Sequence, residues 1–213
     1  MHTGIKFYFE EDFKRAMKAI IKKLGGPYIM IPRALITLKR KVINRVVTFL
    51  YGKSVGKFGK GSVLQSGIYF EDPSQVFIGN NCFIWRGVTV TSDFEAKPLV
   101  LEDKVQINQY STIDVTGALT IGAGTLVSEH AFIYTHDHGL DPKSKPQAYD
   151  KVIGKKVWVG MRAIILAKCT SIGDHAVIGA CSLITKDVPA GAIMGGIPAK
   201  ILGWKEGYKP EDY

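Results

Sequence analysis

Cysteine is scarce in this 213-residue chain, which contains only Cys82, Cys169 and Cys181. An odd number of widely spaced cysteines argues against the disulfide frameworks that stabilise small secreted domains. It also argues against a zinc site built from cysteines, which needs clustered thiolates. We therefore expect three reduced thiols in the core of a cytoplasmic protein.

Long hydrophobic runs are also missing. Acidic residues at positions 10–12 precede any apolar stretch, so no secretory signal is visible. The most apolar stretches, residues 28–38 and 42–51, are too short to span a membrane and are interrupted by proline or arginine. We expect a soluble protein, or one that lies peripherally at the inner face of the membrane.

The net charge of +9 is concentrated near the N-terminus. Residues 1–60 contain 14 of the 28 lysines and arginines and only three acidic residues, a net charge of +11, so the other 153 residues have a net charge of −2. A nucleic-acid partner is therefore not expected, because the body of the protein lacks a basic stripe with stacking aromatics.

The basic N-terminal segment, residues 1–57, has helical spacing of its apolar residues in two stretches. The first covers residues 5–24 and ends at Gly25-Gly26-Pro27, and the second follows Pro32. The segment is either a pair of helices that cap the open end of the body, or a basic amphipathic surface that contacts anionic membrane headgroups through residues 1–50.

From about Phe58 to residue 204 the sequence repeats every six residues, a period that excludes an α-helix. Aliphatic residues recur at Ile121, Val127, Ile133, Ile153, Val159, Ile165, Ile172, Ile178 and Ile184, with one step of seven. Small or medium residues follow four positions later, at Cys82, Val88, Val105, Ser111, Thr125, Ala131, Val157, Ala163, Cys169, Ala176, Ser182 and Val188. This pattern predicts coils of three short strands, about 18 residues each, that stack in parallel and bury a continuous aliphatic column.

One polar loop, Tyr134 to about Lys151, interrupts the repeat. It is the only place where histidines gather, in the run Tyr134-Thr135-His136-Asp137-His138-Gly139-Leu140-Asp141. A polar loop held by a regular scaffold is a candidate site for chemistry.

The repeat, with an aliphatic residue every six positions and a small or medium residue four positions later, resembles that of the hexapeptide-repeat acyltransferases. Three further motifs strengthen the resemblance. They are Val157-Trp158-Val159-Gly160, Ile178-Gly179-Ala180, and Lys186-Asp187-Val188-Pro189 followed by Gly195-Gly196-Ile197-Pro198-Ala199-Lys200. The resemblance is to the sugar and polysaccharide O-acetyltransferase branch. It implies an all-β fold, a left-handed parallel β-helix at residues 58–204 with an N-terminal α-helical segment at 1–57 and a tail at 205–213. It also implies acetyl-CoA as co-substrate and a homotrimer with active sites between adjacent helices.

The family's loop reads Tyr-Thr-x-x-His-Pro-Leu-Asp, and residues 134–141 overlay it without a gap. The resemblance therefore implies that His138 is the general base, with His136 as the alternative. Asn108 matches an asparagine that lines the acetyl and acceptor site, and Asp114 is a weaker candidate for contact with the acceptor or for orienting the histidine. Gly139 departs from the family, which commonly has proline there.

The resemblance also implies a CoA site near the C-terminal coils. Its residues would be Trp158, Gly160, Ala180, Thr185, Lys186 and Lys200, with the two lysines meeting phosphates. Met161 and Gly203 stand where relatives often have a small polar and a basic residue, so the individual phosphate contacts stay open.

The activity expected from these residues is O-acetylation of a sugar hydroxyl, in cell-surface polysaccharide or glycoconjugate biosynthesis. N-acetylation of an amino sugar is the main alternative, and serine or an antibiotic are other acceptors. Two further classes are a metal-dependent β-helix enzyme that uses His130, His136 and His138, and a scaffold that only binds. The sequence does not identify the acceptor.

Overall fold

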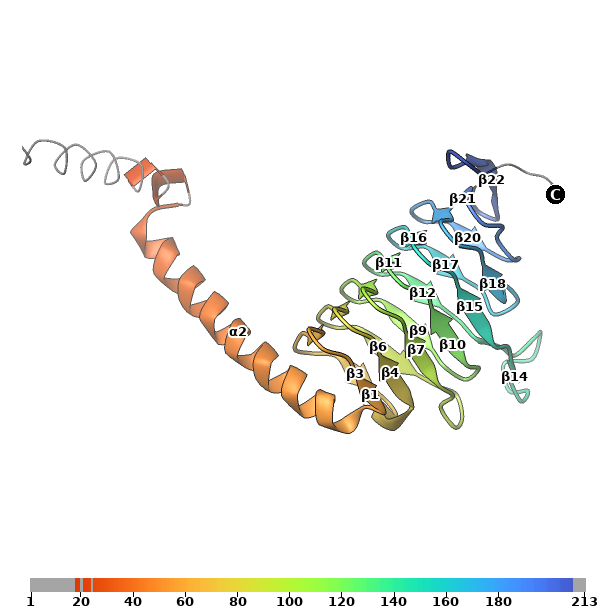
Figure 1. Cartoon of the computed structure of the whole chain (residues 1–213), viewed down its shortest axis with the longest axis horizontal. Helices are drawn as coiled ribbons and strands as arrows, with labels where there is room; N and C mark the ends of the chain where they lie inside the picture. The colour runs from red at the N-terminus through yellow and green to blue at the C-terminus, as the bar shows by residue number, and fades with distance from the viewer. Residues whose placement is uncertain (1–17, 20, 24, 209–213) are drawn as a thin grey trace, which may run out of the picture. The chain divides into compact units, whose positions relative to one another are not determined.

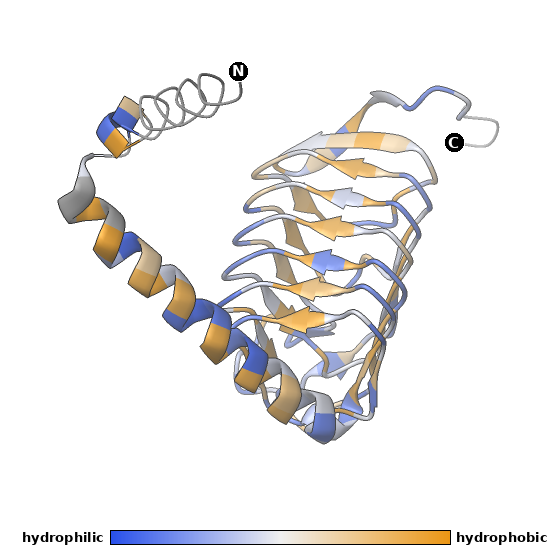
Figure 2. Ribbon diagram, turned by 60° about the vertical axis from the view of Figure 1, so that its left-hand side comes forward, coloured by the Kyte–Doolittle hydropathy of each residue, from blue (hydrophilic) through white to orange (hydrophobic). Residues whose placement is uncertain are grey.

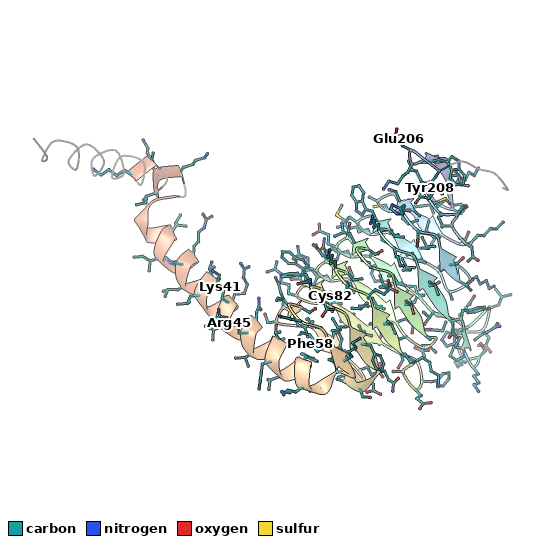
Figure 3. The ribbon with its side chains drawn as sticks, viewed as in Figure 1. Lys41, Arg45, Phe58, Cys82, Glu206 and Tyr208 are labelled. Atoms are coloured by element: carbon teal, nitrogen blue, oxygen red, sulfur yellow. The ribbon has the colours of Figure 1, made fainter. Side chains whose placement is uncertain are left out.

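A computed structural model describes residues 18–19, 21–23 and 25–208, which divide into two units between Ile43 and Asn44. The second unit is a stack of short strands coiled around one axis, a parallel β-helix (Figure 1). Phe58 lies in its first coil and Tyr208 near its C-terminal end (Figure 3). Most of the helix predicted over residues 5–24 lies outside the described residues.

Helix α2 (Pro27–Ser54) starts before Pro32 and contains it, whereas the sequence predicted a start after Pro32. It has six lysines and arginines and no acidic residue. Large apolar side chains are exposed along it, namely Ile29, Ile31, Leu35, Ile36, Leu38, Val42, Ile43, Val46, Phe49 and Leu50. No helix in the described part of the chain has both the length and the apolar character needed to cross a membrane.

The last turns of α2, from Asn44 onward, belong to the second unit and close the first coil. The Asn44 side-chain oxygen accepts a hydrogen bond from the Ser66 amide, and the Tyr51 hydroxyl donates one to the Ile68 carbonyl. Val47 and Tyr51 also pack against the buried core. Residues 44–54 of α2 therefore cap the first coil.

Three parallel sheets form the faces of the β-helix. Sheet A contains β1 (Lys57–Phe58), β4 (Val76–Ile78), β7 (Leu99–Leu101), β10 (Leu119–Ile121), β15 (Lys151–Ile153) and β18 (Ser171–Ile172). Sheet B contains β2 (Val63–Leu64), β5 (Phe83–Ile84), β8 (Gln106–Ile107), β11 (Leu126–Val127), β16 (Trp158–Val159), β19 (Val177–Ile178), β21 (Ala192–Gly196) and the antiparallel β22 (Ala199–Trp204). Sheet C contains β3 (Tyr69–Phe70), β6 (Thr89–Thr91), β9 (Thr112–Asp114), β12 (Phe132–Ile133), β17 (Ile164–Ile165) and β20 (Leu183–Ile184). A short 3₁₀ helix, η1 (Pro73–Gln75), precedes β4.

The inward positions form the aliphatic column that the repeat predicts. Leu64, Ile84, Ile107, Val127 and Val159 lie on successive strands of sheet B and are all buried. Every small residue predicted four positions after an aliphatic one is buried as well, from Cys82 to Val188. Many of the strand residues are apolar, with polar ones between them, in Figure 2. The predicted architecture is confirmed.

The expectation that all three thiols lie in the core is wrong for one of them. Cys82 and Cys169 are buried, and burial raises the pKa of Cys169 to about 11. Cys181 is exposed and has a φ of 58°, because it occupies a left-handed corner position between β19 and β20 rather than an inward one.

The coils are longer than the 18 residues that three equal hexads predict. Partners in adjacent coils are 20 residues apart at Leu64–Ile84 and Leu101–Ile121, and 19 apart at Ile153–Ile172. The additional residues lie at the corner between sheets C and A. The other two corners are tight turns through residues with positive φ, such as Lys104 and Tyr110.

Close stacking explains the glycines that follow the aliphatic residue. A Cβ added to Gly122 would lie 2.5 Å from the backbone carbon of Gly154 in the next coil, closer than atoms of that kind can approach. Glycine therefore lets the corners between sheets A and B stack on one another.

Candidate active site

The wide corner between sheets C and A is where the chain departs from the coil. Residues 92–98 leave it after β6, and residues 134–150 leave it after β12. The longer loop contains a two-stranded antiparallel ribbon, β13 (His136–Asp137) with β14 (Gln147–Ala148). Both excursions start from strands of one parallel sheet, so their first residues meet at the same edge.

Asp93, Thr116 and His136 occupy equivalent places in three successive coils. Each lies three residues after an inward residue of sheet C, and these inward residues, Val90, Ile113 and Ile133, are register partners. The Asp93 amide donates a hydrogen bond to the Thr116 hydroxyl (3.0 Å), and that hydroxyl lies 3.2 Å from His136 Nδ1. The register of the coils thus assembles the cluster.

Asp114 is the buried centre of this cluster. Its carboxylate accepts hydrogen bonds from the Thr116 hydroxyl, the Thr135 amide and the Thr135 hydroxyl. His136 Nδ1 lies 2.9 Å from Asp114 Oδ2. Burial alone would raise the pKa of Asp114, but these hydrogen bonds outweigh burial and lower it. The carboxylate therefore stays ionised and orients the His136 ring, with Nδ1 as the donor.

His138 is held by a different acceptor. Its Nδ1 lies 2.9 Å from the Ser144 carbonyl oxygen, which can only accept, so Nδ1 carries the proton. The Ser144 hydroxyl donates in return to the His138 carbonyl. The Nε2 atom lies 3.0 Å from Asp93 Oδ2. The Ser144 carbonyl, followed by Asp93, raises the pKa of His138 above its ordinary value.

Asp93 is the residue that sequence reasoning missed. Its carboxylate is 3.0 Å from His138 Nε2 and 3.6 Å from His136 Nε2, and its side chain is 45% exposed. The signal was available in the excursion of residues 92–98, because it leaves the repeat at the same corner as the histidine loop. The alternative trio with His130 is not assembled: the His130 ring stacks on Tyr110, and the group found among the described residues is Asp93, His136 and His138.

Two separate pockets lie at this edge, and Thr185 lines both of them. The first, about 290 Å³, is lined by Tyr134, His136, Asp137, Leu166, Ala167, Lys168 and Thr185. The second, about 450 Å³, is lined by Ile184, Thr185, Lys186, Asp187, Met194, Pro198, Ala199, Lys200 and Ile201. The first pocket thus lies beside the histidine loop, and the second lies beside Lys186 and Lys200.

The other predicted residues lie at a different corner, between sheets B and C. Asn108 follows β8, and its Oδ1 accepts a hydrogen bond from the side-chain Nε2 of Gln106 (2.8 Å). Trp158 is an exposed residue of β16 whose indole donates to the Ser128 hydroxyl, and Gly160 and Ala180 follow β16 and β19. Within one chain, sheet C separates these four residues from His136, His138, Asp114, Thr185 and Lys186.

Lys151 is a second residue that the sequence did not single out. It is only 1% exposed, and its ammonium donates to the carbonyls of Leu166 and Ala167, which line the first pocket. Burial lowers its pKa. An inward lysine in an aliphatic column thus holds the corner beside the histidine loop.

Comparison with known proteins identifies the family, although no family model matches the chain. WbbJ of Escherichia coli K12, described as an O-acetyltransferase of lipopolysaccharide biosynthesis, is 31% identical over 147 residues, which are 63% of this chain and 74% of WbbJ. The hexapeptide-repeat acetyltransferase VCA0836 of Vibrio cholerae superposes with a TM-score of 0.54 at 23% identity, over 86% of this chain and 98% of that one. The N-acyltransferase AntD of Bacillus cereus was solved with dTDP and 3-hydroxybutyryl-CoA. It superposes with a TM-score of 0.65 at 16% identity, over 74% of this chain and 87% of AntD.

The coil architecture and these similarities define a left-handed parallel β-helix of the acyltransferase class. The chain belongs to the hexapeptide-repeat acyltransferases, and within them to the branch of sugar and polysaccharide O-acetyltransferases.

We expect Lys151→Met to lower the free energy of unfolding by about 1–3 kcal/mol, because methionine fills the space but leaves the buried Ala167 carbonyl without its donor. The Leu166 carbonyl keeps a second donor, the Cys169 amide. Urea unfolding at fixed protein concentration measures the change, and Lys155→Met, at an exposed lysine of the next corner, is the control. Equal midpoints for both variants would contradict the role of Lys151.

Proposed function

We propose that this protein transfers the acetyl group of acetyl-CoA to a hydroxyl of a sugar acceptor, in the biosynthesis of a polysaccharide or another glycoconjugate. The observation that carries the proposal is the pair of pockets that share Thr185, one beside the histidine loop and one beside Lys186 and Lys200. Two neighbouring pockets of this kind suit a substrate with a reactive thioester at one end and phosphates at the other. WbbJ supports the sugar acceptor, and the acyl-CoA complex of AntD supports the donor.

His138 is the proposed base. With its Nδ1 proton donated to the Ser144 carbonyl, the neutral ring offers the Nε2 lone pair to the acceptor hydroxyl. The hydroxyl oxygen attacks the thioester carbonyl as its proton moves to Nε2, and the carbon–sulfur bond then breaks. The CoA thiolate leaves and takes up the proton, so no covalent acyl-enzyme forms. Asn108 helps to place the acceptor, and His136 is the alternative base.

The proposed CoA contacts are those of the family motifs. Trp158, Gly160 and Ala180 flank the pantetheine arm, while Thr185, Lys186 and Lys200 lie toward the phosphates. Lysine ammonium groups are suitable partners for phosphate because they are compact cations.

These contacts need more than one copy of the chain. His138 and Thr185 lie at the corner between sheets C and A, whereas Asn108 and Trp158 lie at the corner between sheets B and C. We therefore propose a homotrimer in which each site uses the first corner of one chain and the second corner of its neighbour, a head-to-tail arrangement that closes into a ring.

Replacing the base tests the activity. We expect His138→Ala to lower kcat for acceptor-dependent CoA release by about 10²–10⁴-fold, the usual contribution of a general base. Free thiol is measured with a panel of sugars, amino sugars, serine and chloramphenicol. His136→Ala is the matched comparison. If CoA release is lost in that variant and not in His138→Ala, His136 is the base. Turnover restricted to amino sugars would establish N-acetylation instead.

Mixed trimers test the shared site. When His138→Ala and Asn108→Ala chains are unfolded and refolded together, we expect about a quarter of wild-type activity to return, since about one interface in four combines two intact corners. Mixing His138→Ala with the double variant His138→Ala/Asn108→Ala is the control, because no chain in that mixture has an intact His138. No recovery in the first mixture, with trimers shown by light scattering, would rule out a site shared between chains.

The basic N-terminal segment is proposed to contact anionic membranes. No acidic residue occurs between Asp12 and Glu71, and α2 exposes both apolar and basic side chains, including Lys41 and Arg45 (Figure 3). We expect the full chain to float with vesicles that contain anionic lipid, and a chain lacking residues 1–50 to remain unbound. Flotation that is unchanged by the deletion, or equal with neutral vesicles, would refute the contact.

A further inference from the structure

His136 and His138 both direct an unprotonated ring nitrogen, Nε2, toward the Asp93 carboxylate. The Nδ1 atom of each ring is engaged by a group that only accepts, Asp114 Oδ2 for His136 and the Ser144 carbonyl for His138. Each Nδ1 therefore carries a proton, so in the neutral rings both Nε2 atoms are lone-pair donors. Both Nε2 atoms face one oxygen of Asp93, at 3.6 Å and 3.0 Å.

Two lone pairs and a carboxylate oxygen repel one another unless a positive charge lies among them. That charge is either a proton on one of the rings or a metal ion bound by all three groups. One potential ligand atom from each of the three residues lies within 4.8 Å of the others. Ligand atoms around a tetrahedral zinc ion with bonds near 2.05 Å lie roughly 3.3 Å apart, between the two distances to Asp93.

The surroundings match those of metal-binding histidines. Such histidines donate their second ring N–H to a carboxylate or a backbone carbonyl, which fixes the tautomer and leaves the other nitrogen for the metal. Asp114 and Ser144 supply one partner of each kind. The cluster is also open to solvent, since the side chains of His138 and Asp93 are 30% and 45% exposed. An ion bound there keeps room for water or an oxygen ligand.

We propose that Asp93, His136 and His138 form a binding site for a divalent transition-metal ion, with Zn²⁺ as the ion best suited to two imidazoles and one carboxylate. The ion binds through the two Nε2 atoms and the Asp93 carboxylate. This position is in front of the atom that the acceptor hydroxyl must reach, so the bound ion inhibits acetyl transfer by excluding the acceptor. The statement about inhibition rests on the proposed function, whereas the binding itself does not.

Binding is measured with Zn²⁺ alone, by calorimetry and by competition with a chromophoric chelator, on the full chain purified without a histidine tag. We expect one ion per chain for the wild type. Asp93→Asn and His136→Gln should each weaken binding by at least about tenfold, given that loss of even an outer partner costs 10–100-fold. Co²⁺ provides a spectroscopic check, because its visible absorption reports imidazole ligands in a site of low coordination number.

Two controls separate this site from ordinary surface binding. Glu95→Gln removes a carboxylate from the same excursion, where Glu95 pairs with Lys97 at the surface, and should leave the affinity unchanged. Cys181→Ser removes the exposed thiol, the other group that attracts zinc, and should also leave it unchanged. Melting temperatures of all four variants establish that each one is folded.

The outcomes are distinct. Absence of Zn²⁺ binding by the folded wild type overturns the proposal and leaves a proton as the charge between the rings. Binding that survives Asp93→Asn and His136→Gln, or is lost in Cys181→Ser, places the ion elsewhere and overturns it as well. If acetyl transfer is observed, Zn²⁺ should raise the acceptor KM but not the acetyl-CoA KM, and a chelator should reverse the effect. Inhibition that is competitive with acetyl-CoA would refute the position assigned to the ion.

Discussion

The in-register stacking of coils is the constraint on which the rest of this structure depends. Each short strand makes its hydrogen bonds with the coils on either side, so every coil must turn at the same three corners. Side chains that follow equivalent strands therefore form columns along the axis. In the interior, the columns are aliphatic and bury a continuous core. At the wide corner, the same register brings Asp93, Thr116 and His136 together although 43 residues separate the first from the last.

Two charged side chains are buried beside the wide corner between sheets C and A. Asp114 and Lys151 are buried at 3% and 1% exposure, and each is compensated differently. Asp114 is stabilised by donors from Thr116, Thr135 and His136, while Lys151 donates to two backbone carbonyls. A buried charge without such partners would cost several kcal/mol. The two groups lie on either side of the histidine loop, Asp114 beneath its first residues and Lys151 where it returns to the coil. The loop is thus anchored at both ends by satisfied buried charges.

The candidate site could be found from the sequence only in part. His136 and His138 were found because they interrupt a regular pattern, and Asp114 lies in the repeat beside them. Asp93 was missed although its excursion, residues 92–98, interrupts the repeat at the same corner as the histidine loop. Lys151 gave no such signal, since a single lysine at a strand start is common in exposed positions. Asn108 and Trp158 matched family motifs, yet within one chain they lie at another corner. Their separation from the histidines depends on the sheet to which each strand belongs. The residues next to them in the sequence do not reveal that assignment.

The sequence by itself determined the parallel coil, because a six-residue period with small residues four positions later is satisfied by no other regular structure. It also located the histidine loop, which is a local departure from that period, and the end of the β-helix, through the motif of residues 186–200 that resembles the family's. Only the tertiary structure decided the coil length of 19–20 residues, the position of Cys181 outside the core and the convergence of Asp93 on both imidazoles. The physical reason is that period and residue size are encoded locally, whereas corner geometry and contacts between coils arise from hydrogen bonds between residues about 20 positions or more apart.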